Sequence, residues 1–325
     1  MRPNFINIMK KVFNLILLVA LSVFVFSCNK NEDEITPVRD YAEQYATDIE
    51  TIKDFLKTHS ITVINNPGFI DDQDISFTEV SELSAASIWG SDDATHKPDL
   101  LEWPVEKDGF TYTIYYLQLR QGSGANSKSP CNYDDALVAY KGFLIDDDLT
   151  NFQTNANPQD YLNLGTSIRG WSEIFPKFKT GSYVPNANGT LSYTDFGAGV
   201  IFIPSGLAYF NGSPTGIPAY SPLIFGFKLL EIQRVDHDSD GIYSYQEDIN
   251  GDGYLRDNDT THEDDTDQDG KPDFVDTEDD GDGFLTKFEL KKPDDTYHTY
   301  ETVPSCVGET PKRYLSRTCF PPFIN

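Results

Sequence analysis

Aromatic and apolar residues recur between positions 140 and 232 in an order that would line a pocket for a proline ring. They lie in the segments AYKGFL, LGTSIRGW, IPSGLAY and GIPAYSPLIFGFKLLEI. Rotation about the peptide bond before a proline faces a barrier of about 18–20 kcal/mol, because the amide must give up its resonance. A pocket that excludes water from that amide favours the twisted, less dipolar state over the planar one. The pattern therefore predicts prolyl isomerisation.

A second pattern is a series of regularly spaced acidic residues after position 235. A twelve-residue calcium loop uses carboxylates at positions 1, 3 and 5, glycine at position 6 and a bidentate acid at position 12. Four segments fit: DHDSDGIYSYQE fills every position, DINGDGYLRDND is weaker because it ends in Asp, and DTDQDGKPDFVD and EDDGDGFLTKFE follow. The candidate ligands are Asp236, Asp238, Asp240, Ser244, Glu247, Asp248, Asn250, Asp252, Asp259, Asp265, Asp267, Asp269, Asp273, Asp276, Glu278, Asp280, Asp282 and Glu289.

The chemistry of these ligands indicates structural Ca²⁺. Hard oxygen ligands without His or Cys favour Ca²⁺ over zinc, and their number favours Ca²⁺ over Mg²⁺. Residues 236–295 hold 22 Asp and Glu against 5 Lys and Arg, so without cations the segment would repel itself and stay disordered. The first loop resembles an EF-hand and the last two resemble thrombospondin type-3 repeats, whose ions lie along an extended chain. We expect a calcium-stabilised stalk with little helix; a disordered acidic tail is the alternative.

Several elements must position the aromatic residues. Residues 39–59 carry apolar side chains at three- and four-residue steps, which predicts one amphipathic helix packed on the domain that follows. The segments FTYTIYYLQL, DALVAYKGFLI and LIFGFKLLEIQ are rich in β-branched and aromatic residues and predict strands. SIRGWSEIFPKF has helical spacing, but Pro176 removes a backbone hydrogen bond, so we expect a short or distorted helix.

In this order, residues 110–235 resemble an FKBP-type peptidyl-prolyl cis-trans isomerase. The resemblance implies an α+β fold in which an antiparallel half-barrel sheet wraps a short helix, with the pocket between them. It implies that the Ile168 N–H and the Tyr209 hydroxyl meet substrate carbonyls and that the Trp171 indole forms the pocket floor. No cofactor is implied for catalysis, and the partners are proline-containing polypeptides. The implied pocket residues are Tyr140, Phe152, Gln153, Ile168, Trp171, Tyr209, Ile217 and Phe225.

The chain departs from the family pattern at several places that bear on activity. Gln153 stands where the family has a pocket aspartate, and Asp160 stands where another pocket aromatic is common. Phe210 replaces a glycine, and about seventeen residues near 182–198 are inserted. Replacing one buried hydrogen-bonding side chain typically removes about 1–3 kcal/mol. We therefore expect an isomerase weakened by about one to two decades. A non-catalytic peptide-binding module and a calcium-stabilised surface adhesin are the alternatives.

The N-terminus has the pattern of an exported lipoprotein. Three basic residues precede the apolar run 12–26, which is too short for a spanning helix and is typical of a secretory signal. The sequence VFSC resembles a bacterial lipoprotein cleavage site, with Val25 in place of the usual Leu, and the resemblance implies that Cys28 is lipidated. Several acyl chains, at about 0.8 kcal/mol per buried CH₂, would hold it on a membrane. An uncleaved membrane anchor is the alternative.

Composition and cysteine usage agree with an envelope protein. The 325 residues carry a formal net charge of −27, which excludes the basic face that a nucleic-acid binder needs. Of the remaining cysteines, Cys306 and Cys319 are the expected disulfide pair and Cys131 is left over. We expect a lipid-anchored outer-membrane protein, periplasmic or surface-exposed. Its regions are a signal peptide (1–27), a tether (28–38), a helical and mixed region (39–109), the isomerase domain (110–235), calcium repeats (236–295) and a tail (296–325).

Overall fold

The computed structural model describes residues 37–90, 98–255, 264–308 and 310–319. The signal peptide, Cys28 and the candidate ligand Asp259 lie outside these residues. No described helix has both the length and the apolar character that crossing a bilayer requires.

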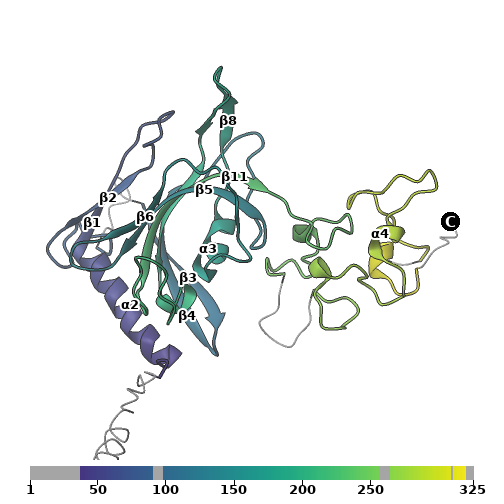
Figure 1. The fold of residues 1–325 in the computed structure, drawn as a ribbon, viewed down its shortest axis with the longest axis horizontal. Helices are drawn as coiled ribbons and strands as arrows, with labels where there is room; N and C mark the ends of the chain where they lie inside the picture. The colour runs from purple at the N-terminus through teal and green to yellow at the C-terminus, as the bar shows by residue number, and fades with distance from the viewer. Residues whose placement is uncertain (1–36, 91–97, 256–263, 309, 320–325) are drawn as a thin grey trace, which may run out of the picture. The chain divides into compact units, whose positions relative to one another are not determined.

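The main sheet has seven antiparallel strands and is open, not closed into a barrel (Figure 1). The strand order is β3-β4-β10-β11-β5-β6, and β7 also pairs with β5. The mixed helix and antiparallel sheet agree with the predicted fold class. The strands are β3 (Leu100–Lys107), β4 (Phe110–Arg120), β5 (Asp135–Leu144), β6 (Asn151–Asn155), β7 (Leu162–Asn163), β10 (Gly197–Ile203) and β11 (Leu223–Gln233).

The central strands are largely apolar because both faces of the sheet are covered. Tyr112 and Ile114 of β4 belong to the core that contains helix α3. Tyr115 and Leu117 of the same strand belong to a second core, which contains helix α2. Successive side chains of a strand point to opposite faces, so a strand buried on both faces needs the near-continuous hydrophobic runs that this sequence shows.

Helix α2 (Tyr41–Thr58) covers the second face, as the pattern over residues 39–59 predicts. It begins after Asp40, whose carboxylate accepts hydrogen bonds from the N–H groups of Ala42 and Glu43, so the first turn is capped. A two-stranded sheet of β1 (His59–Val63) and β2 (Ile75–Glu79) follows it.

Helix α3 (Arg169–Ile174) lies on the first face and continues into a 3₁₀ turn, η1 (Phe175–Lys177), at Pro176. The expectation of a short, distorted helix is confirmed. The inserted region before β10 forms a hairpin of β8 (Ser182–Pro185) and β9 (Leu191–Thr194). A further 3₁₀ turn, η2 (Ser205–Leu207), follows β10.

Strand β3 was not predicted. The sheet begins at Leu100, ten residues before the expected first strand, and β3 pairs along its whole length with β4. Pro104 concealed the strand, since a proline cannot donate to a sheet ladder. It fits here because β3 is the edge strand and needs a donor on one side only.

Regular structure is sparse in the described part of the acidic segment, which contains the short helical turns η3 (Ser244–Gln246), η4 (Asp273–Val275) and α4 (Thr286–Glu289), and η5 (Arg313–Leu315) follows in the tail. The expected extended stalk is wrong, because the segment folds back on itself. Ile242 and Leu290, from the two ends of the segment, share one buried cluster with Val303 and Tyr314 of the tail. The tail therefore contributes to the same small core as the repeats.

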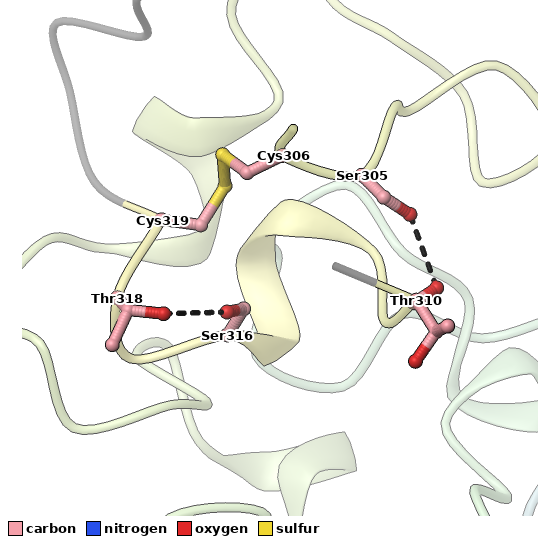
Figure 2. The surroundings of a disulfide bond; sticks show 6 residues. All are labelled: Ser305, Cys306, Thr310, Ser316, Thr318 and Cys319. Carbon is pink, nitrogen blue, oxygen red and sulfur yellow. Dashed lines mark hydrogen bonds between the residues drawn. A yellow bond between two sulfur atoms is a disulfide. The ribbon is translucent and has the colours of Figure 1, made fainter. Parts of the chain in front are cut away.

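A disulfide closes the tail. Cys306 and Cys319 are bonded with a Cα–Cα distance of 5.8 Å, which confirms the predicted pair (Figure 2). The hydroxyl of Ser305, which immediately precedes the loop that the disulfide closes, donates to the Thr310 carbonyl within it at 3.1 Å. Cys131 remains a free thiol.

Candidate functional site

Four aromatic rings from distant segments meet beside α3. The Trp171 ring lies 5.0 Å from Phe225 of β11 and 5.0 Å from Tyr140 of β5, both edge-on. Phe152 of β6 lies 5.6 Å from Phe225 at 88°, and Tyr140 lies 6.0 Å from Phe225. Edge-to-face pairs at these separations are the favoured aromatic geometry. Phe225 thus lies at the centre of the predicted set.

Burial decreases outward from this centre. Phe225 and Trp171 are 2% and 6% exposed, whereas Tyr140 and Phe152 are half-buried and Tyr209 is 41% exposed. The set therefore has a dry floor and a partly open rim. Ile217 is buried in the same core, and the neighbouring Gly216 lies beside Phe152.

A glycine of β5 makes room for the rings. A Cβ atom at Gly142 would lie 2.4 Å from the Phe152 ring and 2.9 Å from the Phe225 ring, closer than carbon atoms can approach. The glycine two residues after Tyr140 is therefore a packing requirement of this site.

Helix α2 holds the turn that precedes Tyr209. The Asp48 carboxylate of α2 accepts hydrogen bonds from the Ser205 N–H at 2.7 Å and the Ser205 hydroxyl at 2.6 Å, at the start of η2. The Gln44 amide donates to the other oxygen of Asp48 at 2.6 Å. This buried network fixes the turn from which Tyr209 extends.

Phe210 adopts a backbone conformation that favours glycine, with φ of +48°. Its ring stacks on Tyr41 of α2 at 4.2 Å and meets Tyr220 edge-on at 5.2 Å. Its N–H donates to the Ser205 carbonyl at 2.8 Å. A phenylalanine in place of a glycine at this position therefore strains the backbone, but it adds a ring that packs against Tyr41 and Tyr220.

The two tyrosines of the site are hydrogen-bond donors over a wide pH range. Burial raises the pKa of Tyr209, and burial together with the nearby Tyr209 raises the pKa of Tyr140. Both phenols therefore keep their protons at neutral and mildly alkaline pH.

The remaining two predicted residues lie at the edge of the set. Ile168 immediately precedes α3 and packs against its core. None of the described residues accepts a hydrogen bond from its N–H. Gln153 lies opposite Gly142 in the β5–β6 register, and its side chain is exposed.

Two surface grooves are lined almost entirely by residues outside this aromatic set. The larger, of about 700 Å³, is lined by residues such as Ile70, Tyr161 and Tyr193, and contains none of the eight candidates. The smaller, of about 130 Å³, contains only Tyr140 among them. The candidate site is therefore defined by the converging rings, of which only Tyr140 also lines the smaller groove.

In the part of the acidic segment that the structure describes, four groups of carboxylates have oxygens within 4.8 Å of one another. Two groups contain an aspartate that the sequence pattern did not assign, Asp264 and Asp279. No sequence signal marks either of them, since each is one acid within an acidic run. The groups are Asp238, Asp240, Glu247 and Asp279; Asp248, Asp252 and Asp264; Asp265, Asp267 and Asp269; and Glu278, Asp280 and Asp282.

Four of the predicted carboxylates that the structure describes lie outside these groups. Asp236 accepts hydrogen bonds from two N–H groups of its own loop, and Asp273 accepts from the Thr266 N–H and hydroxyl. Asp276 pairs with Lys271 at 3.4 Å. Glu289 is fully buried, and both its oxygens lack a hydrogen-bond partner within the described ranges.

Two predicted ligands are not carboxylates and have hydrogen bonds within their own loops. The Ser244 hydroxyl accepts from the His237 N–H at 3.3 Å. The Asn250 side-chain oxygen accepts from the Asp252 N–H at 2.7 Å.

The buried carboxylates fit a bound cation. Burial and the neighbouring aspartates raise the pKa of Glu247 to about 10, and burial with nearby acids raises that of Asp279 to about 11. Neither residue has a basic group or hydrogen-bond donor on its carboxylate oxygens among the described residues. An ionised carboxylate in such a place costs several kcal/mol unless a positive charge compensates it.

Part of the chain is similar in sequence to a known isomerase. It is 29% identical over 121 residues to the FKBP-type peptidyl-prolyl cis-trans isomerase FkpA of Escherichia coli K12. The match covers 37% of this chain and 38% of FkpA. This homology to an FKBP-type isomerase is of low identity and spans about two-fifths of either protein.

Two solved structures resemble the chain at low similarity. A peptidyl-prolyl cis-trans isomerase from Pseudomonas syringae has a TM-score of 0.31 and 24% identity over 43% of this chain and 84% of its own. FkpA from Escherichia coli has a TM-score of 0.33 and 18% identity over 72% of this chain and 74% of its own. The family description "BamM C-terminal" matches residues 237–313, which include the acidic repeats and part of the tail.

Proposed function

We propose that this chain is an FKBP-type peptidyl-prolyl cis-trans isomerase of the bacterial envelope, with reduced activity, that assists the folding of secreted or outer-membrane proteins. The observation that carries the proposal is the meeting of Tyr140, Phe152 and Trp171 around Phe225. These rings come from three strands and a helix, and core packing alone does not require a half-open rim. The sequence similarity to FkpA supports the same assignment.

The geometry gives each part of the site a role. A proline ring on the Trp171–Phe225 floor would lose contact with water, and so would the amide before it. The planar amide is the more dipolar state and loses more solvation, so the twisted state is favoured. The Ile168 N–H and the Tyr209 hydroxyl would hold the flanking carbonyls of the substrate while the bond rotates. Rotation needs neither a nucleophile nor a cofactor.

A protease-coupled assay on a prolyl tetrapeptide tests the activity. Tyr209→Phe removes a single hydroxyl and is expected to lower kcat/KM several-fold without unfolding the protein. Tyr183→Phe, on the exposed β8–β9 hairpin, is the matched control and should leave kcat/KM unchanged. A wild-type rate equal to the uncatalysed rate would refute the proposal.

The reduced activity rests on Gln153. Gln153→Asp restores the residue that the family has at this position and is expected to raise kcat/KM by about tenfold, or about 1.4 kcal/mol. Gln153→Ala should not raise it. Should both variants and the wild type bind a prolyl peptide without accelerating its isomerisation, the chain is a peptide-binding module instead.

Lipid anchoring at Cys28 places the protein on a membrane in this proposal. The supporting observations are the basic start, the apolar run 12–26 and the VFSC sequence. Cells grown with an alkyne-labelled fatty acid should label the wild-type protein, whereas Cys28→Ser should stay unlabelled and leave the membrane fraction. An equally labelled Cys28→Ser protein would contradict the anchor.

Calcium has a structural part in the proposal. The supporting observations are the four carboxylate groups and the buried, unpaired oxygens within them. Extracellular modules bind Ca²⁺ at about 10⁻⁴–10⁻³ M, so the sites would be filled outside the cytoplasm. Calorimetry with CaCl₂ should detect uptake, and chelation should lower the melting temperature. No heat of binding at millimolar Ca²⁺ would refute this part alone.

A further inference from the structure

The aspartate that joins the first loop comes from another part of the acidic segment. Asp279 has a carboxylate oxygen within 4.8 Å of oxygens from Asp238, Asp240 and Glu247. The last three lie in the first loop, whereas Asp279 is the second residue of the fourth. Calcium loops do not draw a ligand from that second position, so Asp279 has no role within its own loop's pattern.

Every member of this group has an oxygen without a partner. Glu247 and Asp279 are 1% and 2% exposed, and across the described residues neither oxygen of either carboxylate has a hydrogen-bond partner. One oxygen each of Asp238 and Asp240 is unpaired in the same way. Buried polar atoms nearly always have partners. Six orphaned oxygens in one small volume therefore mark the place of a missing positive group.

We propose that Asp279 is a ligand of the calcium ion in the first loop, so that one ion joins the first and fourth loops. This proposal rests on the proposed calcium binding. Four carboxylates and no nitrogen or sulfur ligand suit a hard divalent cation, and Glu247 in position 12 supplies the bidentate group that Ca²⁺ takes and Mg²⁺ does not need. A lysine could neutralise only one of the four charges.

The packing around the group explains what such a link would hold together. Gly241 of the first loop approaches Leu290, since a Cβ atom there would lie 3.2 Å from its Cδ1. Lys287 donates to the Ser239 carbonyl at 3.1 Å. The Asp279 N–H donates to the Thr286 hydroxyl at 3.3 Å, which fixes its own backbone. The ion would therefore close the small core of Ile242 and Leu290 from one side.

If one ion joins the first and fourth loops, removing calcium should affect the structure of both loops together. Without the ion, the four carboxylates repel one another, and the first loop loses its tie to the fourth. Loops joined only within themselves would each lose calcium independently. A ligand supplied from another loop makes the affinity of the first site depend on the fold of the whole segment.

Calorimetric titration of the full chain with CaCl₂ tests the proposal. Asp279→Asn keeps the shape of the side chain and removes its charge. We expect it to weaken one site by at least about tenfold and to leave the other sites unchanged. Asp294→Asn makes the same charge change at an exposed position outside the four groups and should match the wild type.

A double variant separates a ligand from a purely structural residue. Glu247→Gln should weaken the same site, and Asp279→Asn combined with Glu247→Gln should cost less than the sum of the two single losses, because both serve one ion. The circular dichroism spectrum of each variant is compared with that of the wild type at saturating Ca²⁺, to confirm that the variant folds. Asp279→Asn with wild-type affinity at every site, in a protein that does bind calcium, would overturn the link alone. A wild type that binds no calcium would overturn the calcium proposal and the link together.

Discussion

At Phe210, backbone strain lowers the stability of the protein and side-chain packing raises it, and the two effects can be measured separately. A non-glycine residue in the left-handed region costs about 1–2 kcal/mol, and Phe210 has φ of +48°. Its ring is 8% exposed and packs between Tyr41 and Tyr220. Removing a buried phenylalanine ring costs about 3–5 kcal/mol. The lower end applies because the stacking partner Tyr41 is itself 40% exposed.

Two substitutions separate these terms. Phe210→Ala loses the ring and keeps the strain, so we expect destabilisation by about 3 kcal/mol. Phe210→Gly loses the ring and the strain, but the unfolded chain gains about 0.5–1 kcal/mol of backbone entropy. The glycine variant should therefore exceed the alanine variant in stability by up to about 1.5 kcal/mol. At an ordinary position the order is the reverse.

Urea unfolding followed by tryptophan fluorescence measures both values, since all three tryptophans lie between residues 89 and 171. Leu83 is the matched control, with φ of +54° and 57% exposure. Its Ala and Gly variants should show the same order but lie close to the wild type. A glycine variant of Phe210 less stable than the alanine variant would refute the strain reasoning, and two variants equal to wild type would refute the packing reasoning.

Three further outcomes are expected. Gly142→Ala drives a methyl group into the Phe152 ring and should lower kcat/KM about tenfold or more while leaving most of the stability; unchanged kinetics would show that the ring can move aside. Asp48→Asn leaves the Ser205 donors with a weaker acceptor and should destabilise the protein by about 1–3 kcal/mol, seen as a lower urea midpoint; an unchanged midpoint contradicts this. Burial raises the pKa of Asp72, but hydrogen bonds from a backbone N–H and a guanidinium outweigh it and hold the pKa below its usual value. Its stabilising contribution is therefore present above about pH 4 and lost on further acidification, and Asp72→Asn should flatten the stability profile there.

Local patterns were sufficient where one element decides the structure. The helix over residues 39–59 follows from apolar spacing and the Asp40 cap, and β4, β5 and β11 follow from β-branched and aromatic runs. The hydrophobic run of β11 did not indicate that the two faces of this strand pack in different cores. That depends on what packs on each side of the sheet, which a single strand does not encode.

Candidate ligands and structural contacts that come from distant parts of the chain could not be predicted from the sequence. Asp264 and Asp279 look like any other acid in an acidic run, and only the folded segment brings them to other loops. Asp48 is one polar residue on an amphipathic helix, yet it is buried and holds Ser205. In each case the role of the residue depends on a contact with a residue far away in the chain, and the periodicity of the sequence does not predict such contacts.

The support of the aromatic site extends beyond the segment that resembles an isomerase. Deleting residues 40–109 would uncover the apolar face formed by residues such as Val200, Phe202 and Ile224, which packs against α2. It would also remove β3 from the sheet edge and Asp48 from the turn before Tyr209. Helix α2 and the described strands of the main sheet belong to the same compact unit, which agrees with this dependence. A fragment that begins at residue 110 would therefore keep the residues that surround the proline ring but lose the contacts that hold one of them, Tyr209, in place.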